Sequence, residues 1–580
     1  MKKFRRIMAL LLATVMVLSM GAVAFADETT TYKITITPNA DNDEHTYKAY
    51  QIFTGTLDTD EDSPTKGQLT NLGFATGVNG TALLNALKAD ATIGAKFASA
   101  ENTAASIAAA MSKCTGTGEP EALAAVIGKY VETAALSEAG TSVDNVISGL
   151  PQGYYFVKDV STGLTKDTKS EYMLQVVGDV TVKAKDSTVT MDKKVDDKND
   201  SNTSEDAIAW QDSADYDIGD TISYRLKGTL PSNYAKFDFF DYEFTDVMCA
   251  GLTLNANSVK VVYYANEDAF TADTTATGGT DITDEFKING SGAGATLSVK
   301  IESAFDADGN VTDAGLKSIT GITKDSVIVV YYTCVLNDSA EIGATGNDNT
   351  AKLTFSNNPN ATGNGDNTKS ETPEDKNIVF TYKTDIDKVD EKGNALKGAD
   401  FTLYKEVADS TVTGATQGKD LTFTEGVEHT AIKENSYYVV VGKKTGSAAG
   451  STFEFKGIDD GTYVLVETTV PAGYNAWNSK EFTVTATHDV EADAPKLLTL
   501  TGTDPFTNAN AGTGAVEVAK EDGTKHSMVS GELYTEIENK SGAQLPSTGG
   551  IGTTIFYIIG AILVIGAGVV LVTRRRMSAN

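Results

Sequence analysis

Short runs in which apolar and polar residues alternate recur along most of the chain. Alternation with a period of two places the apolar side chains on one face of a β-strand. Glycine and asparagine between the runs supply turns, so we predict a mainly β protein. The clearest runs are Tyr32–Thr37, Gly153–Val157, Tyr172–Val182, Thr221–Leu230, Ser258–Tyr264, Ser326–Val335, Thr350–Phe355, Phe401–Lys405, Phe453–Phe455 and Tyr463–Glu467.

One stretch has a helical period instead. Residues Asn79–Leu136 are rich in alanine. Near their end, apolar residues recur at three- and four-residue spacing and fall on one helical face: Leu123, Val126, Ile127, Tyr130 and Val131. Because strand-like runs resume at Gly153, we predict a helical insertion in an otherwise β unit.

The chain of 580 residues is too long for one hydrophobic core, which indicates several domains. We place them at 27–185, 186–375 and 378–540, with Asn357–Asn377, rich in Asn, Gly, Thr and Pro, as a linker. Many short strands with Gly and Asn turns favour β-sandwiches of immunoglobulin-like layering. We therefore expect three such sandwiches in tandem.

The N-terminal residues 1–26 have the features of a secretory signal. A cationic start precedes an apolar run from Ile7 to Leu18, and Ala24-Phe25-Ala26 forms a small-x-small cleavage pattern. A membrane anchor is the alternative, but the apolar run is short and acidic, polar sequence follows at once. We expect cleavage after Ala26 and a secreted chain.

The C-terminal residues 545–580 combine three features in a fixed order. Leu545-Pro546-Ser547-Thr548-Gly549 is followed by the apolar run Ile551–Val572 and then by three arginines. At 1.5 Å per residue the run spans about 33 Å as a helix, enough to cross a bilayer, and the arginines favour a cytoplasmic end. This order resembles the sorting signal of Gram-positive wall proteins, which sortase transpeptidases read.

The resemblance implies a defined reaction. A sortase cysteine attacks the Thr548 carbonyl, releases the chain from Gly549 onward, and holds the rest as a thioacyl enzyme. An amine of the peptidoglycan precursor then anchors the protein singly, whereas a lysine of another copy makes a polymer. The internal lysines therefore decide between the two outcomes.

Net charge excludes one class of partner. The 48 Lys and Arg against 79 Asp and Glu give −31, and removing both predicted processing segments leaves 41 against 79, or −38. Such a surface repels nucleic acid and suits a solvated extracellular protein.

Little in the sequence indicates metal or cofactor chemistry. Three Cys and four His leave little for a disulfide framework or a zinc cluster. Cys249 and Cys334 could pair, but buried thiols are favoured. The acidic runs Asp58–Asp62 and Asp196–Asp200 do not fit a calcium loop. We expect no cofactor and no metal.

The third unit resembles the Cna B-type domain of Gram-positive surface proteins. The resemblance rests on Asp385–Asp390, Leu396–Phe401, Tyr463–Thr468, Pro471–Tyr474 and Ile537–Asn539. In that family a strand lysine joins an asparagine side chain through an isopeptide bond, helped by a glutamate. Matched by position, these residues are Lys388, Asn539 and Glu467.

Strand periodicity supports this match independently. Residues two apart lie on the same face of a strand. Lys388 therefore shares a face with Ile386, Glu467 with Leu465, and Asn539 with Ile537, so we expect each of the three polar groups to face the core. Burial favours a neutral, nucleophilic lysine and a protonated glutamic acid able to polarise the asparagine carbonyl. Fixed proximity replaces external activation of the amide. A buried salt bridge or solvated charges are the alternative.

A second set opens the middle unit. Lys193 shares a face with Met191 and Val195, whereas Lys194 shares one with acidic residues. Segments around Ile218–Asp220, Leu230-Pro231, Phe244–Asp246 and Ser356–Pro359 resemble the middle domain of sortase-assembled pilin backbones. That resemblance implies a cross-link between Lys193 and Asn349 promoted by Asp246. Asp241 and Glu285 are rival acids, although Glu285 shares a face with polar residues and is expected to be exposed.

The first unit offers a different lysine. It lacks a matching glutamate-bearing strand, so we predict no isopeptide bond there. Backbone pilins carry a Tyr-Pro-Lys-Asn-like motif after a Val-x-Val strand, and Val180–Asp186 resembles it loosely, with Lys185 in the nucleophile's place. On alternation, Lys183 and Lys185 point outward, as intermolecular acyl transfer requires. Lys183 is the alternative nucleophile. The other interpretation is that Lys185 is an ordinary solvated lysine with no role in linkage.

We therefore expect the shaft subunit of a sortase-assembled, wall-anchored pilus that supports adhesion. The implied partners are a class C pilus sortase, a housekeeping sortase, further copies, accessory pilins, peptidoglycan, and a host glycan or matrix protein. A singly anchored adhesin, or a tip or basal subunit, is the first alternative. A wall-anchored hydrolase is the second, but no Gly-x-Ser-x-Gly elbow is present, so we expect no enzyme.

Overall fold

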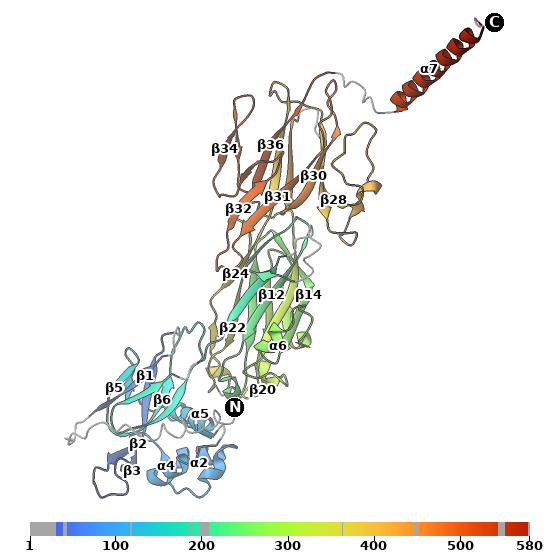
Figure 1. Cartoon of the computed structure of the whole chain (residues 1–580). Helices are drawn as coiled ribbons and strands as arrows, with labels where there is room; N and C mark the ends of the chain where they lie inside the picture. Colours follow the sequence, from blue (N-terminus) through green and yellow to red (C-terminus); the bar gives the residue numbers. More distant parts are fainter. Residues whose placement is uncertain are drawn as a thin grey trace.

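The computed structural model describes residues 31–38, 43–116, 119–184, 187–197, 208–361, 363–445, 450–542 and 551–577. The β-rich parts follow one another in a row, and the C-terminal helix projects from the far end (Figure 1). The buried apolar residues gather separately in the first, middle and third thirds of the chain. The mainly β prediction is confirmed.

In its described residues, the first unit combines two sheets with four helices. One sheet has the order β5 (Val146–Leu150), β1 (Tyr32–Thr37), β8 (Val180–Lys183). The other runs β3 (Leu69–Phe74), β2 (Tyr47–Leu57), β6 (Gly153–Asp159), β7 (Glu171–Val176), with β4 (Gly140–Thr141) on β2. The helices are α2 (Gly80–Ala89), α3 (Gly94–Phe97), α4 (Ala104–Met111) and α5 (Glu119–Thr133). They lie within the predicted helical insertion, and Leu123, Ile127, Tyr130 and Val131 are buried as the period requires.

The middle unit is a sandwich of two large sheets. The first has the order β10 (Trp210–Gln211), β9 (Met191–Asp196), β12 (Thr221–Thr229), β21 (Val327–Leu336), β14 (Leu252–Tyr264), β15 (Thr280–Asp281), with β17 (Gly292–Ala293) on β14. The second has the order β11 (Ser213–Asp215), β24 (Asp375–Phe380), β22 (Asn347–Ser356), β13 (Tyr242–Met248), β18 (Thr296–Ile301), β16 (Lys287–Asn289), with β23 (Lys369–Glu371) on β22. A short pair, β19 (Ala304–Phe305) and β20 (Val311–Asp313), and helix α6 (Glu267–Thr271) complete it.

The third unit is a second sandwich. One sheet is β29 (Thr452–Ile458), β25 (Tyr382–Asp390), β36 (Glu532–Asn539), β33 (Asn508–Asn510). The other is β27 (Thr416–Gln417), β28 (Tyr437–Thr445), β26 (Asp400–Val407), β30 (Gly461–Thr469), β31 (Lys480–His488), β32 (Leu497–Gly502), and a hairpin joins β34 (Val516–Ala519) to β35 (Lys525–Met528). Single 3₁₀ turns lie at η2 (Tyr234–Lys236), η3 (Thr283–Glu285), η4 (Leu316–Ser318), η5 (Asn364–Asp366) and η6 (Gly418–Asp420).

The linker predicted at Asn357–Asn377 is wrong. Strand β23 pairs with β22, and β24 pairs with both β22 and β11, so the segment belongs to the middle sandwich. Asn357 is buried, and its side chain donates to the Ser370 hydroxyl over 2.7 Å. Side-chain hydrogen bonds therefore hold a polar segment in place that its composition alone marks as loop.

The middle and third units share an extensive junction. Lys405 of β26 is buried and forms ion pairs with Asp217 at 2.7 Å and Asp459 at 2.6 Å. The Ile218 amide donates to the Gly457 carbonyl, and the Asp212 amide to the Val490 carbonyl. Only one residue, Thr381, separates β24 from β25. These contacts restrain bending between the two units.

The C-terminal helix α7 (Ile551–Met577) is set apart from the sandwiches (Figure 1). Its segment Ile558–Arg575 is long and apolar enough to cross a membrane. Its described side chains are exposed, which suits a helix that is surrounded by lipid.

Candidate functional site

Three strands of the middle sandwich bring Lys193, Asp246 and Asn349 together. Lys193 lies on β9 in one sheet, and the other two lie on the neighbouring strands β13 and β22 of the facing sheet. Their side chains point between the sheets, because alternation places Val195 and Phe244 on the same inner faces. All three residues are completely buried.

A fourth residue, Tyr332 of β21, joins the set. The Lys193 Nζ donates to Asp246 Oδ2 at 2.8 Å and to the Tyr332 hydroxyl at 2.9 Å. The Asn349 Nδ2 also donates to that hydroxyl at 2.9 Å, and the hydroxyl donates to Asp246 Oδ2. Tyr332 therefore lies between the amine and the amide that the predicted cross-link would join.

Burial determines the protonation of this cluster. Desolvation lowers the pKa of Lys193, although Asp246 opposes the shift. Desolvation, and then the Asp246 carboxylate, raises the pKa of Tyr332 well above its ordinary value, so it keeps its proton. Among the residues that the structure describes, the Asn349 Oδ1 and Asp246 Oδ1 have no hydrogen-bond partner. Burial therefore makes the Lys193 amine easier to deprotonate. This amine lies near the Asn349 amide, whose carbonyl oxygen accepts no hydrogen bond from the described residues.

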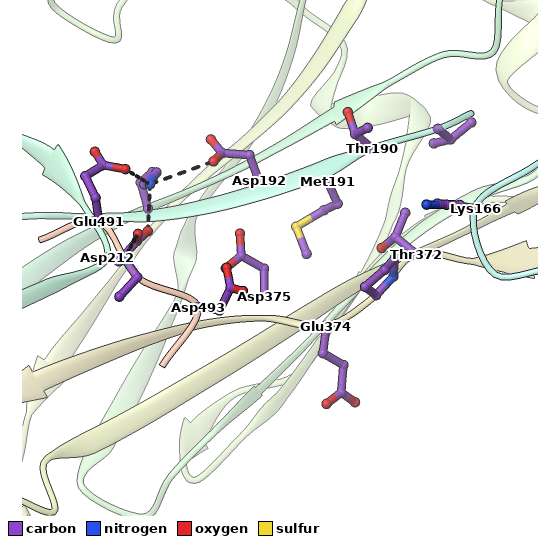
Figure 2. A pocket seen from close by; sticks show the side chains of 14 residues that line it. Lys166, Thr190, Met191, Asp192, Asp212, Thr372, Glu374, Asp375, Glu491 and Asp493 are labelled. Atoms are coloured by element: carbon purple, nitrogen blue, oxygen red, sulfur yellow. Dashed lines mark hydrogen bonds and ion pairs between the residues drawn. The ribbon is translucent and has the colours of Figure 1, made fainter. Parts of the chain in front are cut away.

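The outward face of β9 has a different role. Lys194 forms ion pairs with Asp212 at 2.7 Å and with Glu491 at 3.2 Å. These residues line a pocket of about 460 Å³ that the middle unit shares with Lys166 of the first unit and Asp493 of the third (Figure 2). Alternation thus commits Lys193 to the core, as predicted from the sequence. It places Lys194 on the opposite face, which here lies at the boundary between units.

The C-terminal sandwich holds the second set. Lys388 on β25 and Asn539 on β36 lie on parallel neighbours, with Lys388 opposite Ile537 and Asp390 opposite Asn539. Glu467 lies on β30 of the facing sheet. Lys388 is completely buried and the other two are 1% exposed. The structure therefore brings together the three residues that the sequence singled out.

The contacts of this set differ from the middle one. The Lys388 Nζ donates to the Ile537 carbonyl at 2.7 Å. Glu467 accepts from the Asn539 Nδ2 and from the Trp477 backbone amide, each at 2.8 Å. Desolvation lowers the pKa of Lys388 to about 8 and raises the pKa of Glu467. Both shifts favour the neutral forms that amide exchange needs.

One detail departs from the expected chemistry. We expected Glu467 to polarise the Asn539 carbonyl, but the amide nitrogen faces the carboxylate, and the Asn539 Oδ1 has no hydrogen-bond partner in the described part of the chain. An ionised carboxylate accepts only, so it selects the NH₂ side of the amide. A protonated Glu467 would donate instead, and a half-turn of the amide would present the carbonyl oxygen to it.

The rival acids have other surroundings. Asp241 is buried, but it accepts from the Ser303 amide at 2.6 Å and pairs with Lys369 at 2.9 Å. Glu285 is exposed on η3, as expected. The three cysteines are free thiols, so Cys249 and Cys334 do not pair.

The residues for intermolecular linkage are described only in part. Lys183 is exposed at the end of β8, and the next residue, Ala184, is buried. This alternation matches the predicted one. Lys185, the motif Leu545, Pro546, Ser547, Thr548 and Gly549, and the signal segment 1–26 lie outside the described residues.

Sequence reasoning missed Tyr332 and the Trp477 amide. Tyr332 follows Tyr331 in a long apolar strand, and only register against β12 and β14 places its hydroxyl between the amine and the amide. The one signal in the sequence is alternation, which places Tyr332 on the same inward face of its strand as Val330 and Cys334. A backbone amide leaves no signal in the sequence.

Comparisons with known proteins identify two segments. The model of the SpaA prealbumin-like fold domain matches residues 383–496, and that of the LPXTG cell wall anchor motif matches residues 537–578. The trypsin-resistant surface T6 protein of Streptococcus pyogenes serotype M6 is 26% identical over 445 residues, covering 71% of this chain and 72% of that protein. The chain therefore ends in a cell wall anchor and carries a prealbumin-like domain before it.

Two solved structures resemble the chain at low identity. The T6 backbone pilin of Streptococcus pyogenes is 17% identical, with a TM-score of 0.47, 90% of this chain covered and 100% of that one. The major pilin SpaD of Corynebacterium diphtheriae is 16% identical, with a TM-score of 0.43, 90% of this chain covered and 99% of that one.

Proposed function

We propose that the chain is the structural shaft subunit of a covalent pilus on a Gram-positive cell. The proposal rests on one combined observation. The chain carries a cell wall anchor at residues 537–578, and 71% of its length aligns with a curated streptococcal surface protein. In this account a sortase transfers the Thr548 acyl group to Lys185 of the next copy. A housekeeping sortase attaches the finished polymer to peptidoglycan.

The two buried sets serve this function as internal cross-links. Lys193 would bond to Asn349 and Lys388 to Asn539, each with loss of one ammonia: the amine nitrogen attacks the amide carbon and the amide NH₂ leaves. Asp246 and Glu467 promote the exchange. Support comes from the complete burial of both lysines and from the unpaired carbonyl oxygens of both asparagines. The reaction occurs once per molecule, so the protein's role is structural rather than enzymatic.

A singly anchored adhesin is the second candidate, because the wall anchor alone fits either protein. Wall extracts from cells carrying Lys185→Ala separate the two on a denaturing gel, with Lys183→Ala as the matched control. A pilus shaft gives a high-mass ladder that Lys185→Ala abolishes and Lys183→Ala preserves. A single band from unmodified cells would favour the adhesin, and a ladder that survives Lys185→Ala would contradict the assignment of the nucleophile.

A further inference from the structure

A buried histidine that the cross-links do not use lies where the first unit meets the middle unit. His45 precedes β2, and 2% of its side chain is exposed. Its Nδ1 lies 2.6 Å from Oδ2 of Asp159, the last residue of β6. Its Nε2 lies 3.6 Å from Oδ2 of Asp167, in the loop between β6 and β7. Both carboxylates are completely buried, so one imidazole lies between two buried acids.

The surroundings of His45 favour its charged form. An ionised carboxylate only accepts hydrogen bonds, so a ring that faces a carboxylate through each nitrogen is matched best when both nitrogens carry hydrogen. That form is the imidazolium, and its charge offsets the repulsion between the two buried carboxylates. Further titratable groups around the cluster are Asp43 on the same segment, Lys169 and Glu171 beside Asp159, Tyr47, which stacks on His45, and Tyr172, which packs against Tyr47.

Asp167 connects this histidine to the start of the middle unit. Its Oδ1 accepts from the Thr188 hydroxyl at 2.7 Å, and the two residues form an antiparallel β-bridge. Two backbone hydrogen bonds flank the bridge, from Thr168 to the Ser187 carbonyl at 3.0 Å and from Val189 to the Lys166 carbonyl at 2.8 Å. We call this bridge, with its two flanking hydrogen bonds, the joint. Because the chain enters β9 directly after it, the joint fixes where the middle sandwich begins.

The loop that carries Asp167 is held from both sides. On the first unit's side, the Asp43 carboxylate accepts from the Lys166 amide at 3.0 Å, and the Asp43 amide donates to Asp167 at 2.7 Å. On the middle unit's side, the loop makes three hydrogen bonds, with Asn233, Asn357 and Ser370. Desolvation raises the pKa of Asp167, but the His45 hydrogen bond and then the Asp43 amide outweigh it, so this pKa lies below its usual value. Asp167 therefore stays ionised near neutral pH.

We propose that the His45 imidazolium is a positioning group that fixes the joint between the first and middle units and releases it as pH rises. The folded chain would keep the second proton of His45 where the unfolded chain, with an ordinary pKa of about 6.5, has lost it. The contribution of His45 is then full below about pH 6.5 and disappears as pH rises through the value at which the folded His45 deprotonates.

The joint bears on the proposed pilus linkage at one point. Lys185, the proposed acceptor, precedes Ser187 by two residues, and the Ser187 carbonyl accepts a hydrogen bond in the joint. Loosening the joint would therefore free one flank of the acceptor segment. This consequence rests on the proposed function, whereas the pH dependence of the joint does not.

Proton NMR of the processed chain 27–548 across pH 5–9 measures the charge of His45. The chain has four histidines, and the ring signal that disappears in His45→Gln identifies the one in question. We expect its midpoint about one pH unit or more above that of His429, which is exposed. Asp167→Asn should lower the His45 midpoint. A His45 signal that titrates together with that of His429 would overturn the proposal.

Hydrogen exchange measures the joint itself. Protection of the Thr168 and Val189 amides, corrected for the intrinsic effect of pH, should fall about tenfold or more between pH 6 and pH 9. His45→Gln should have low protection at both values, and the matched control His429→Gln should follow the unmodified chain. Protection that does not change with pH in the unmodified chain, or that is equal in His45→Gln, would contradict the proposal.

A second variant separates the joint from the folding of the first unit. Thr188→Val keeps the shape of the side chain but removes its hydrogen bond to Asp167. It should lower the protection of Val189 at every pH and leave the His45 midpoint unchanged. Unaltered protection would refute the connection through Asp167. Because none of these measurements uses a sortase, their outcome is independent of whether Thr548 is found bonded to Lys185.

Discussion

Lys193 and Lys388 are both completely buried, yet different neighbours control them. Lys193 contacts a carboxylate and a phenol, whereas the Lys388 ammonium donates to a backbone carbonyl. A direct carboxylate contact favours the charged amine, and a carbonyl compensates less. Deprotonation of Lys193 therefore depends on proton transfer within its cluster, whereas desolvation lowers the pKa of Lys388 to about 8.

Replacing Glu467 tests the C-terminal cross-link. Glu467→Gln removes the acid but keeps the shape, so the Lys388–Asn539 bond should fail to form. The intact mass of the chain should then rise by about 17 Da, one ammonia, relative to the unmodified chain, beyond the mass change of the substitution itself. Glu425→Gln, in an exposed loop, is the control and should retain both bonds. If Glu467→Gln lost as much ammonia as that control, the role of Glu467 would be refuted.

Replacing Tyr332 tests the middle set. Tyr332→Phe removes the hydroxyl that bridges Lys193 and Asn349, so the cross-link should form slowly or not at all, and the unfolding temperature should fall. Tyr331→Phe is the matched control, because the neighbouring hydroxyl points away toward Tyr264. Mass spectrometry measures the loss of ammonia, and thermal unfolding measures the change in unfolding temperature. Complete ammonia loss in Tyr332→Phe at the unmodified rate would show that the hydroxyl has no part.

Glu171 makes the stability of the first unit depend on pH. Burial raises its pKa to about 8, although the Lys158 Nζ lies 3.9 Å from Oε1. Among the described residues, neither carboxylate oxygen has a hydrogen-bond partner. The folded state therefore holds the proton between about pH 4.5 and 8, where the unfolded state has released it. Stability is full below this window and falls as pH rises through it, by at most about 1.4 kcal/mol per pH unit.

Denaturant titrations at pH 5 and pH 8 measure this loss. We expect the unmodified chain to lose more stability between the two values than Glu171→Gln, which cannot ionise. Other titrating groups contribute equally to both proteins and cancel in the difference. Equal losses in the two proteins would contradict a raised pKa at Glu171.

At the scale of elements, alternation predicted the sandwich strands well. The strands around Tyr32, Thr221 and Phe401 fall within a residue or two of their predicted bounds, because inner and outer faces differ in polarity there. The run Tyr172–Val182 is instead two strands, β7 and β8, in different sheets, and the strand predicted to begin at Ser258 begins at Leu252. The same parity predicted the inward direction of Lys193, Glu467 and Asn539. Alternation carries no information on which strands become neighbours, so the place of Tyr332 beside Lys193 and Asn349 emerged only from the three-dimensional arrangement.

The segment after β22 shows why composition misled. Asn, Gly and Thr favour loops in isolation. Here Asn357 and Ser370 bond to each other, and β24 pairs with β22 and β11. Tertiary pairing therefore outweighed local preference, and the segment became part of the middle sheet.

Replacing Gly343 tests how closely the middle and third units pack at their junction. Gly343, in the loop before β22, has φ of +86°, and a Cβ there would meet the backbone of Ser530 and Gly531 within 2.6 Å. Gly343→Ala should destabilise the chain by about 1–3 kcal/mol and expose the junction to proteolysis. Gly414→Ala isolates the backbone strain, because Gly414 has φ of +83° and open space around it. Equal losses of unfolding free energy in the two variants would contradict a packed junction.

At the scale of the whole molecule, the two predicted cross-links tie early strands to late ones. The middle bond would join β9 to β22, and the C-terminal bond would join the neighbouring strands β25 and β36. A pull along the row of units in Figure 1 would then be borne by covalent bonds in two sandwiches instead of by strand hydrogen bonds. The three thiols are free, so disulfides do not share this role.

The central claim is that one copy of the chain is bonded through Thr548 to a lysine of the next. Tandem mass spectrometry of a proteolytic digest of the high-mass wall polymer tests it most directly. The account predicts a branched peptide in which the Thr548 carbonyl is joined to the Lys185 Nζ, and its absence from cells carrying Lys185→Ala. Thr548 joined only to peptidoglycan fragments would contradict the account.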